Sequence, residues 1–177
     1  MGIRKPKRIE DEFHKNCGEI LKLSLSVESR LNFLLSNYFA NNIQDNRNFI
    51  LEDFLIKKVF FDEKRELLRK IVKREYNDRK NDIFNPIKMY DLNKALVYIM
   101  ETRNKIAHGS TIYNHETQKF TINKGKSKIS EKDDIEINAK LVEKIRNQAE
   151  KAMKDLIDIY MTLSIKDRMK TKPKNGL

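Results

Sequence analysis

Cysteine, proline, glycine and tryptophan are all scarce in this chain of 177 residues. The one cysteine, Cys17, excludes a disulfide within the chain, and its place in an apolar helical pattern predicts a buried thiol. Three prolines and five glycines leave long stretches without a residue that breaks helices. Charged residues make up 36% of the chain and apolar residues 39%, a balance that favours long helices with solvated faces.

Long apolar runs are also missing. No stretch approaches the roughly 20 consecutive apolar residues that a membrane-spanning helix requires. The first eight residues are basic, and no apolar run follows them as it would in a secretory signal. We therefore expect a cytoplasmic protein with no membrane segment.

The residue types that hold metals and common cofactors are too few or too scattered. The three histidines and the cysteine show no zinc-ligand spacing. There is no phosphate-binding loop motif, and the glycines are too few for a dinucleotide fingerprint. We expect neither a metal nor a cofactor.

Apolar residues recur at three- and four-residue steps in several segments, which is the spacing of amphipathic helices. Two short β-branched and aromatic segments, 111–113 and 119–122, predict a β-hairpin between the last two helices. Polar stretches at 76–84 and 124–134 predict loops. The fold class is therefore all-α, an antiparallel bundle of about five helices with a small hairpin insertion. The predicted helices cover residues 9–38, 48–58, 62–75, 86–108 and 139–163.

One domain accounts for this pattern. We expect a helical domain over residues 9–165, between a basic N-terminal tail of residues 1–8 and a basic flexible tail of residues 166–177. No internal repeat or second domain is apparent.

The net charge of +11, from 37 basic and 26 acidic residues, permits two interpretations. A basic surface binds polyanions such as RNA by releasing their counterions, but lysine-rich surfaces also simply keep helices soluble. Basic residues crowd both tails and the stretch 64–80. The candidate RNA-binding residues are Lys64, Arg65, Arg69, Lys73, Arg74 and, further along the chain, Lys105.

The most informative segment is Arg103-Asn104-Lys105-Ile106-Ala107-His108, followed by Gly109. Arg103 occupies a position in the apolar pattern of residues 86–108 where Leu, Ile or Met would be expected. Burying an unpaired guanidinium is costly. Two explanations follow. Arg103 pairs with a carboxylate, for which Glu28 and Glu101 are the candidates, or the apolar seam formed by this pattern opens at Arg103 into a groove. Gly109 suits a left-handed residue just past the helix end.

Arg103 and His108 carry the residue types that phosphate chemistry needs. Arginine recognises phosphate through two parallel hydrogen bonds, and histidine transfers protons near neutral pH. Five helical steps of about 100° set the two side chains about 140° apart, so they converge poorly within one chain. Asn104 and His108, four positions apart, share a face. A two-fold dimer could bring two such pairs into one cleft suited to metal-free cleavage of RNA.

Each of the two residues also has a purely structural interpretation. Arg103 could form a salt bridge that clamps helices, because structural ion pairs also occupy such positions. His108 could be an imidazole that faces the negative end of the helix dipole. The residue types alone leave both interpretations open.

The pattern Arg103-Asn104-x-x-x-His108 at the end of a helix resembles the signature of the HEPN superfamily. Three further segments resemble that family: 28–39 its long first helix, 60–68 the approach to its middle helix, and 98–109 the frame of the motif. The resemblance covers about residues 19–163. It implies a homodimeric helical bundle that cleaves RNA without metal at a composite site.

In this resemblance Arg103 and His108 form the catalytic pair and Asn104 is the orienting polar residue. The products implied are a 2′,3′-cyclic phosphate and a 5′-hydroxyl end. The expected role is a ribonuclease toxin or a defence or stress effector, with RNA, a second copy and an antitoxin or other regulatory protein as partners. Toxins paired with a nucleotidyltransferase antitoxin often carry Tyr two residues after the His, where this chain has Ser110. The alternative is a non-catalytic helical adaptor that binds RNA or protein.

Overall fold

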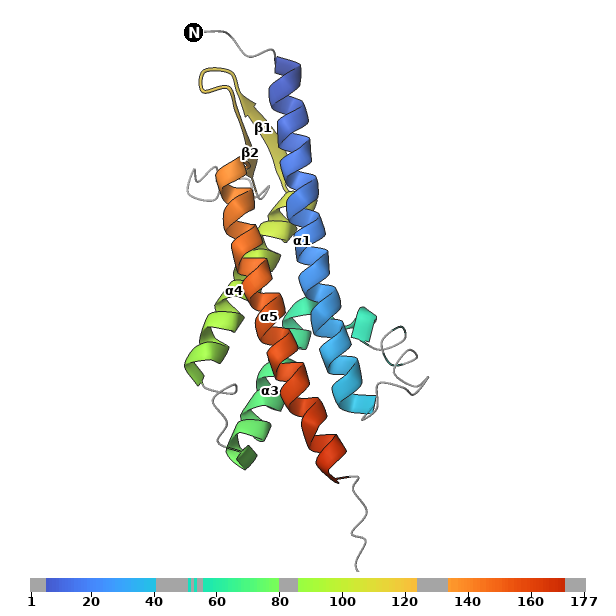
Figure 1. Cartoon of the computed structure of the whole chain (residues 1–177). Coiled ribbons are helices and arrows are strands. Elements are labelled where there is room, and N and C mark those ends of the chain that lie inside the picture. The colour runs from blue at the N-terminus through green and yellow to red at the C-terminus, as the bar shows by residue number, and fades with distance from the viewer. Residues whose placement is uncertain are drawn as a thin grey trace, which may run out of the picture. The chain divides into compact units, whose positions relative to one another are not determined.

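The protein is mostly helical and carries a small three-stranded antiparallel sheet (Figure 1). The computed structural model describes residues 6–40, 51, 53, 56–79, 86–123 and 134–170. Within them lies a short 3₁₀ turn, η1 (Ile56–Lys58). The α-helices described are α1 (Pro6–Ala40), α3 (Phe61–Arg79), α4 (Pro86–His108) and α5 (Ala139–Lys170).

The helices agree with the apolar periodicity, and two of them run further than predicted. α3 continues to Arg79, into the segment predicted as a loop, and α5 continues to Lys170, into the segment predicted as a flexible tail. The α5 extension is rich in Lys and Arg, which are good helix formers, and neither extension contains Pro or Gly, so the end of the apolar pattern did not end the helix. The predicted helix at 48–58 lies largely outside the described residues, as do residues 1–5 and 171–177. The number of five helices stays a prediction.

The chain divides into two compact units. Unit 1 comprises Met1–Ser26 and Val97–Glu150, and unit 2 comprises Val27–Leu96 and Lys151–Leu177. Helices α1, α4 and α5 each contribute residues to both units. The single domain over residues 9–165 stays a prediction.

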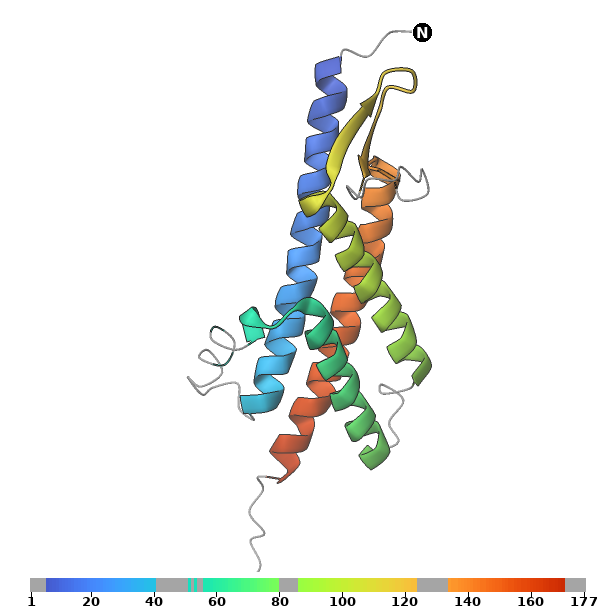
Figure 2. The same cartoon turned by 180° about the vertical axis from the view of Figure 1, so that it is seen from behind.

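Unit 1 contains the sheet. Strands β1 (Ser110–Asn114) and β2 (Lys119–Asn123) form the predicted hairpin, with Tyr113 opposite Phe120. A third strand, β3 (Ile135–Glu136), pairs with β2 and was not predicted, because two residues beside a charged segment carry no readable alternation. The views in Figures 1 and 2 both show the hairpin along the N-terminal part of α1.

The core of unit 1 lies where α1 and α5 meet the sheet. Its buried members are Phe13, Cys17, Ile20, Ile122, Ile137, Val142 and Ile145. Burial raises the pKa of the Cys17 thiol to about 11, so the predicted buried cysteine is confirmed.

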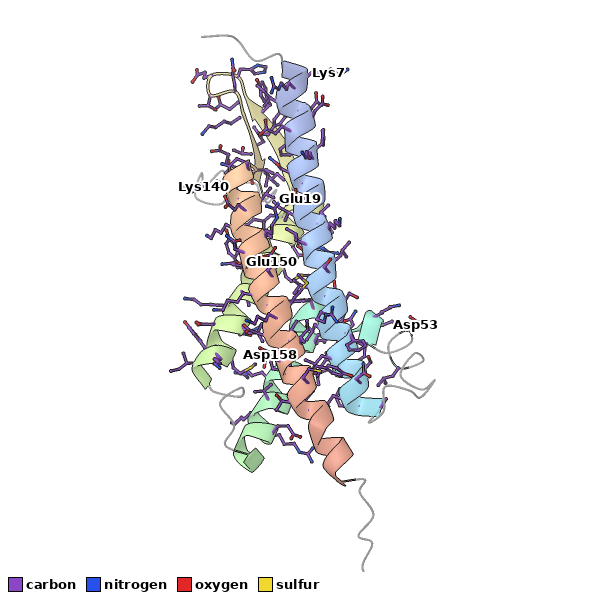
Figure 3. The ribbon with its side chains drawn as sticks, in the orientation of Figure 1. Lys7, Glu19, Asp53, Lys140, Glu150 and Asp158 are labelled. Carbon is purple, nitrogen blue, oxygen red and sulfur yellow. The ribbon has the colours of Figure 1, made fainter. Side chains whose placement is uncertain are left out.

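An ion pair joins the same two helices at the edge of that core. The Arg146 guanidinium donates a hydrogen bond to the Glu19 carboxylate, which lowers the pKa of Glu19. Figure 3 labels Glu19 on α1 and Lys140 and Glu150 on α5. The pair therefore fastens the N-terminal part of α5 to α1.

Unit 2 contains a buried ion pair of its own. The Lys64 ammonium on α3 donates to the Glu28 carboxylate on α1 over 2.7 Å, and the Lys64 side chain is 1% exposed. Beside it, Arg65 donates to the Asn93 side chain of α4 over 2.6 Å. These two contacts tie α3 to its neighbours, since a buried charge requires a partner.

We expect Lys64→Met to lower the free energy of unfolding by about 2 kcal/mol, because it leaves Glu28 without its partner in a partly buried place. The double variant Lys64→Met/Glu28→Leu should recover part of that loss, since it removes both charges. The measurement is urea denaturation followed by circular dichroism. Lys73→Met, at an exposed position of the same helix, is the matched control and should change stability by less than about 0.5 kcal/mol. Equal stability of Lys64→Met and wild type would show that the pair contributes nothing.

Candidate functional site

The last turn of α4 is held against strand β2 by close packing at Gly109. The Gly109 N–H donates to the Lys105 carbonyl over 2.7 Å. A Cβ at Gly109 would lie 2.3 Å from the Ile122 Cγ2 and 2.4 Å from the Lys105 carbonyl oxygen. Gly109 does not adopt the left-handed conformation that the sequence suggested. Glycine is required here because the strand approaches too closely for any side chain.

The apolar seam of α4 passes beside Arg103 rather than through it. Leu96 and Ile99 are fully buried, and the seam continues at Thr102, which is 4% exposed. The Thr102 hydroxyl donates to the Tyr98 carbonyl over 2.8 Å, which satisfies it within the helix. Arg103 is only half-buried at the edge of this seam. Arg103 therefore lies at the edge of the predicted seam, half-buried, rather than fully inside it.

Arg103 and Asn104 are in direct contact. The Arg103 Nη1 donates to the Asn104 Oδ1 over 3.0 Å, and the Asn104 side chain is exposed. The angle between neighbouring helical positions did not suggest this pair, because it describes only the Cβ directions. The long arginine side chain bends back to reach the next residue. Asn104 therefore orients Arg103, whereas the shared helical face had suggested that it would hold His108.

Within the described part of the chain, neither Arg103 nor His108 is paired with an acid. His108 is exposed at the last position of α4, four positions after Asn104. Among the residues that the structure describes, no carboxylate lies within ion-pair distance of either side chain. A helix-clamping salt bridge at Arg103 is therefore not found in that part of the chain.

The two carboxylates proposed as partners of Arg103 lie elsewhere. Glu28 belongs to unit 2 and binds Lys64. Glu101 is exposed, and its place two residues before Arg103 sets it about 200° away around the helix. Both predictions of a supporting carboxylate are wrong. The sequence could not reveal this, because the acid that a base selects depends on tertiary packing.

The predicted RNA-binding residues fall into two groups. Lys64 is enclosed in its ion pair and Arg65 is 19% exposed and bound to Asn93, so these two predictions are corrected: their charges serve packing. Arg69 is exposed but lies 2.9 Å from the Glu66 carboxylate. The remaining candidates are on helix surfaces: Lys73 and Arg74 are exposed on α3, and Lys105 is half-buried on α4.

Neither a metal cluster nor a membrane helix is found in the described residues. Within those ranges, no group of three or more His, Cys, Asp and Glu side chains is arranged to hold a metal ion. None of the helices described there has the length and apolar character that crossing a bilayer requires. The candidate site is the guanidinium, amide and imidazole set of Arg103, Asn104 and His108.

Comparisons of the chain with protein-family models, curated proteins and solved structures found no match. The site must therefore be judged on its own chemistry. That chemistry comprises a guanidinium in contact with the Asn104 amide, an exposed imidazole five residues further on and a glycine that anchors the helix end directly after it.

We expect Gly109→Ala to destabilise the protein by about 2 kcal/mol, because overpacking against backbone atoms forces the helix end away from β2. The same shift should displace His108 and lower any activity of the site. Thermal unfolding monitored by circular dichroism measures the first effect.

Gly18→Ala is the matched control for this substitution. Gly18 is exposed within α1, and a Cβ there would meet nothing within 4 Å. That change should stabilise the protein by about 0.5–1 kcal/mol, through helix propensity. If Gly109→Ala behaved like Gly18→Ala, the close approach of β2 to the helix end would be contradicted.

Proposed function

We propose that this chain is a metal-independent endoribonuclease of the HEPN type that acts as a toxin or as a defence or stress effector in the cytoplasm. One observation carries the proposal. Arg103, positioned by Asn104, and exposed His108 stand at the end of α4 without a carboxylate partner among the described residues. Because no ion pair within those residues uses them, the guanidinium and the imidazole are both available to a phosphate.

The guanidinium of Arg103 and the imidazole of His108 suit cleavage of an RNA phosphodiester by its neighbouring 2′-hydroxyl. The 2′-oxygen of a ribose attacks the neighbouring phosphorus while the bond from phosphorus to the 5′-oxygen breaks. Arg103 stabilises the negative charge that develops on the phosphate oxygens. His108 either removes the proton from the 2′-hydroxyl or supplies one to the departing 5′-oxygen. The products are a 2′,3′-cyclic phosphate and a 5′-hydroxyl, with no net gain or loss of protons.

The active unit that we propose is a homodimer. The Cβ atoms of Arg103 and His108 point about 140° apart around the helix, an angle at which two side chains of one chain converge poorly on a single phosphate. A second copy related by a two-fold axis could supply the missing group to each site.

We expect the purified protein to cleave a short unstructured RNA in the presence of EDTA. Arg103→Ala and His108→Ala should each lower the rate by about 100-fold or more, the typical contribution of a positioned acid or base. Gel analysis of a labelled oligonucleotide measures the rate, and circular dichroism verifies folding. His14→Ala, which removes an exposed imidazole on α1, is the control and should leave the rate unchanged.

Three outcomes would speak against this mechanism. A strict need for Mg²⁺ in the chemical step would exclude metal-free cleavage by Arg and His. Full activity of either variant would exclude the assigned residues. RNA binding without any cleavage would favour the adaptor, in which the same surface binds without cutting.

Subunit mixing tests the composite site. We expect Arg103→Ala and His108→Ala proteins, each inactive alone, to regain activity after their subunits are exchanged. The mixed dimer then contains one site with a wild-type Arg from one chain and a wild-type His from the other. Light scattering establishes the oligomeric state of the active species, and a fully active monomer would contradict the dimer.

A further inference from the structure

Three basic side chains on the exposed side of α3 have no partner within the described part of the chain. Lys70, Lys73 and Arg74 are all exposed, and none of them forms an ion pair or a hydrogen bond with another described residue. A helix of about 3.6 residues per turn sets these side chains within an arc of about 100°. They therefore form one basic face on α3, the helix labelled in Figure 1.

The acidic side chains described on α3 are already engaged or lie at its other end. Glu66 shares the side of the basic face, but its carboxylate lies 2.9 Å from the Arg69 guanidinium. Glu75 is buried, and its carboxylate accepts a hydrogen bond from the Tyr38 hydroxyl over 3.3 Å. The remaining acids described there lie in the first turn, at the positive end of the helix dipole. The helix itself thus leaves the basic face with a net positive charge.

The basic face takes no part in the packing of α3. The stripe that packs consists of Leu68, Ile71 and Val72, each at most 5% exposed. Lys64, in contrast, is a basic residue of the same helix that the fold encloses in an ion pair. Because exposed residues without contacts contribute little to stability, replacing the basic face should change binding and leave the fold intact.

A row of unpaired cations suits a partner with negative charges at regular intervals. RNA is such a partner, because each phosphate that a cation neutralises releases a counterion and so adds affinity. A membrane surface fits this face poorly. Helices that bind there insert an apolar stripe beside their cations, whereas the apolar stripe of α3 is buried within the protein.

We propose that the basic face of α3, formed by Lys70, Lys73 and Arg74, binds the phosphate backbone of single-stranded RNA. The binding is independent of base sequence, because phosphate contacts carry no sequence information. α3 lies wholly within unit 2, whereas Arg103 and His108 belong to unit 1, so we assign the face a role in affinity and none in the chemical step. The inference rests on the proposed function for the choice of RNA as the polyanion.

The test is a fluorescence-anisotropy titration of the full chain with a labelled 2′-O-methyl RNA, which cannot be cleaved by attack of its own 2′-oxygen. The triple variant Lys70→Gln/Lys73→Gln/Arg74→Gln should bind about 100-fold more weakly at about 0.1 M salt. The slope of log affinity against log salt should become shallower by about 2, because each single-strand phosphate contact contributes about 0.7. Circular dichroism verifies folding.

The matched control removes three exposed lysines that lie near the acids Glu19 and Asp155. It is the triple variant Lys15→Gln/Lys22→Gln/Lys154→Gln, which lowers the net charge of the chain by the same amount. Its salt slope should stay within about 0.7, the contribution of one contact, of the wild-type slope. Equal weakening of binding by the two triple variants would overturn the proposal, because affinity would then follow net charge alone.

The outcomes separate this proposal from the ribonuclease proposal. If the wild type binds 2′-O-methyl RNA, the Lys70/Lys73/Arg74 variant loses that binding, and the wild type cleaves no RNA, the basic face is supported and the enzyme is refuted. If the wild type does cleave RNA, the same variant should show a raised KM and an unchanged kcat. An equal KM would refute the basic face alone. Tighter binding of poly-glutamate or of phosphatidylserine vesicles than of RNA at the same salt would overturn the proposal and indicate an acidic protein or a membrane surface.

Discussion

The close approach of Gly109 to strand β2 is the contact on which the candidate site depends. It fixes the last turn of α4, because a side chain at Gly109 would collide with both the strand and the turn itself. His108 precedes this point and Arg103 lies on the turn before it. The core of unit 1 positions β2 in turn, through Ile122, which is 2% exposed. The site is thus placed by packing rather than by polar contacts.

Some basic residues form ion pairs or hydrogen bonds that hold helices together, and others have no acidic partner among the described residues. Lys64 is enclosed in an ion pair, Arg65 holds Asn93, and Arg146 binds Glu19, so these basic groups serve packing. Arg103 binds only a neutral amide among the described residues, and its positive charge is left uncompensated there. A guanidinium without an acidic partner and an exposed imidazole are the two groups that the proposed phosphate chemistry uses.

The features that depend on local chemistry could be predicted from the sequence. Proline at the first position of α4 and glycine after its end bound the helix correctly, and β-branched and aromatic residues predicted the hairpin. The tertiary choices could not be predicted: that Glu28 pairs with Lys64, and that Arg103 reaches Asn104. Those choices depend on which side chains the fold brings together, and periodicity carries no such information.

The chemistry of the cut ends tests the central claim most directly. The substrate is a DNA oligonucleotide with one ribonucleotide, incubated with the protein in EDTA and examined by mass spectrometry. The account predicts cleavage only after the ribose, with a 2′,3′-cyclic phosphate on one fragment and a 5′-hydroxyl on the other. Cleavage of the matching 2′-O-methyl substrate, or fragments that carry a 5′-phosphate, would contradict it, because neither outcome involves attack by the neighbouring hydroxyl.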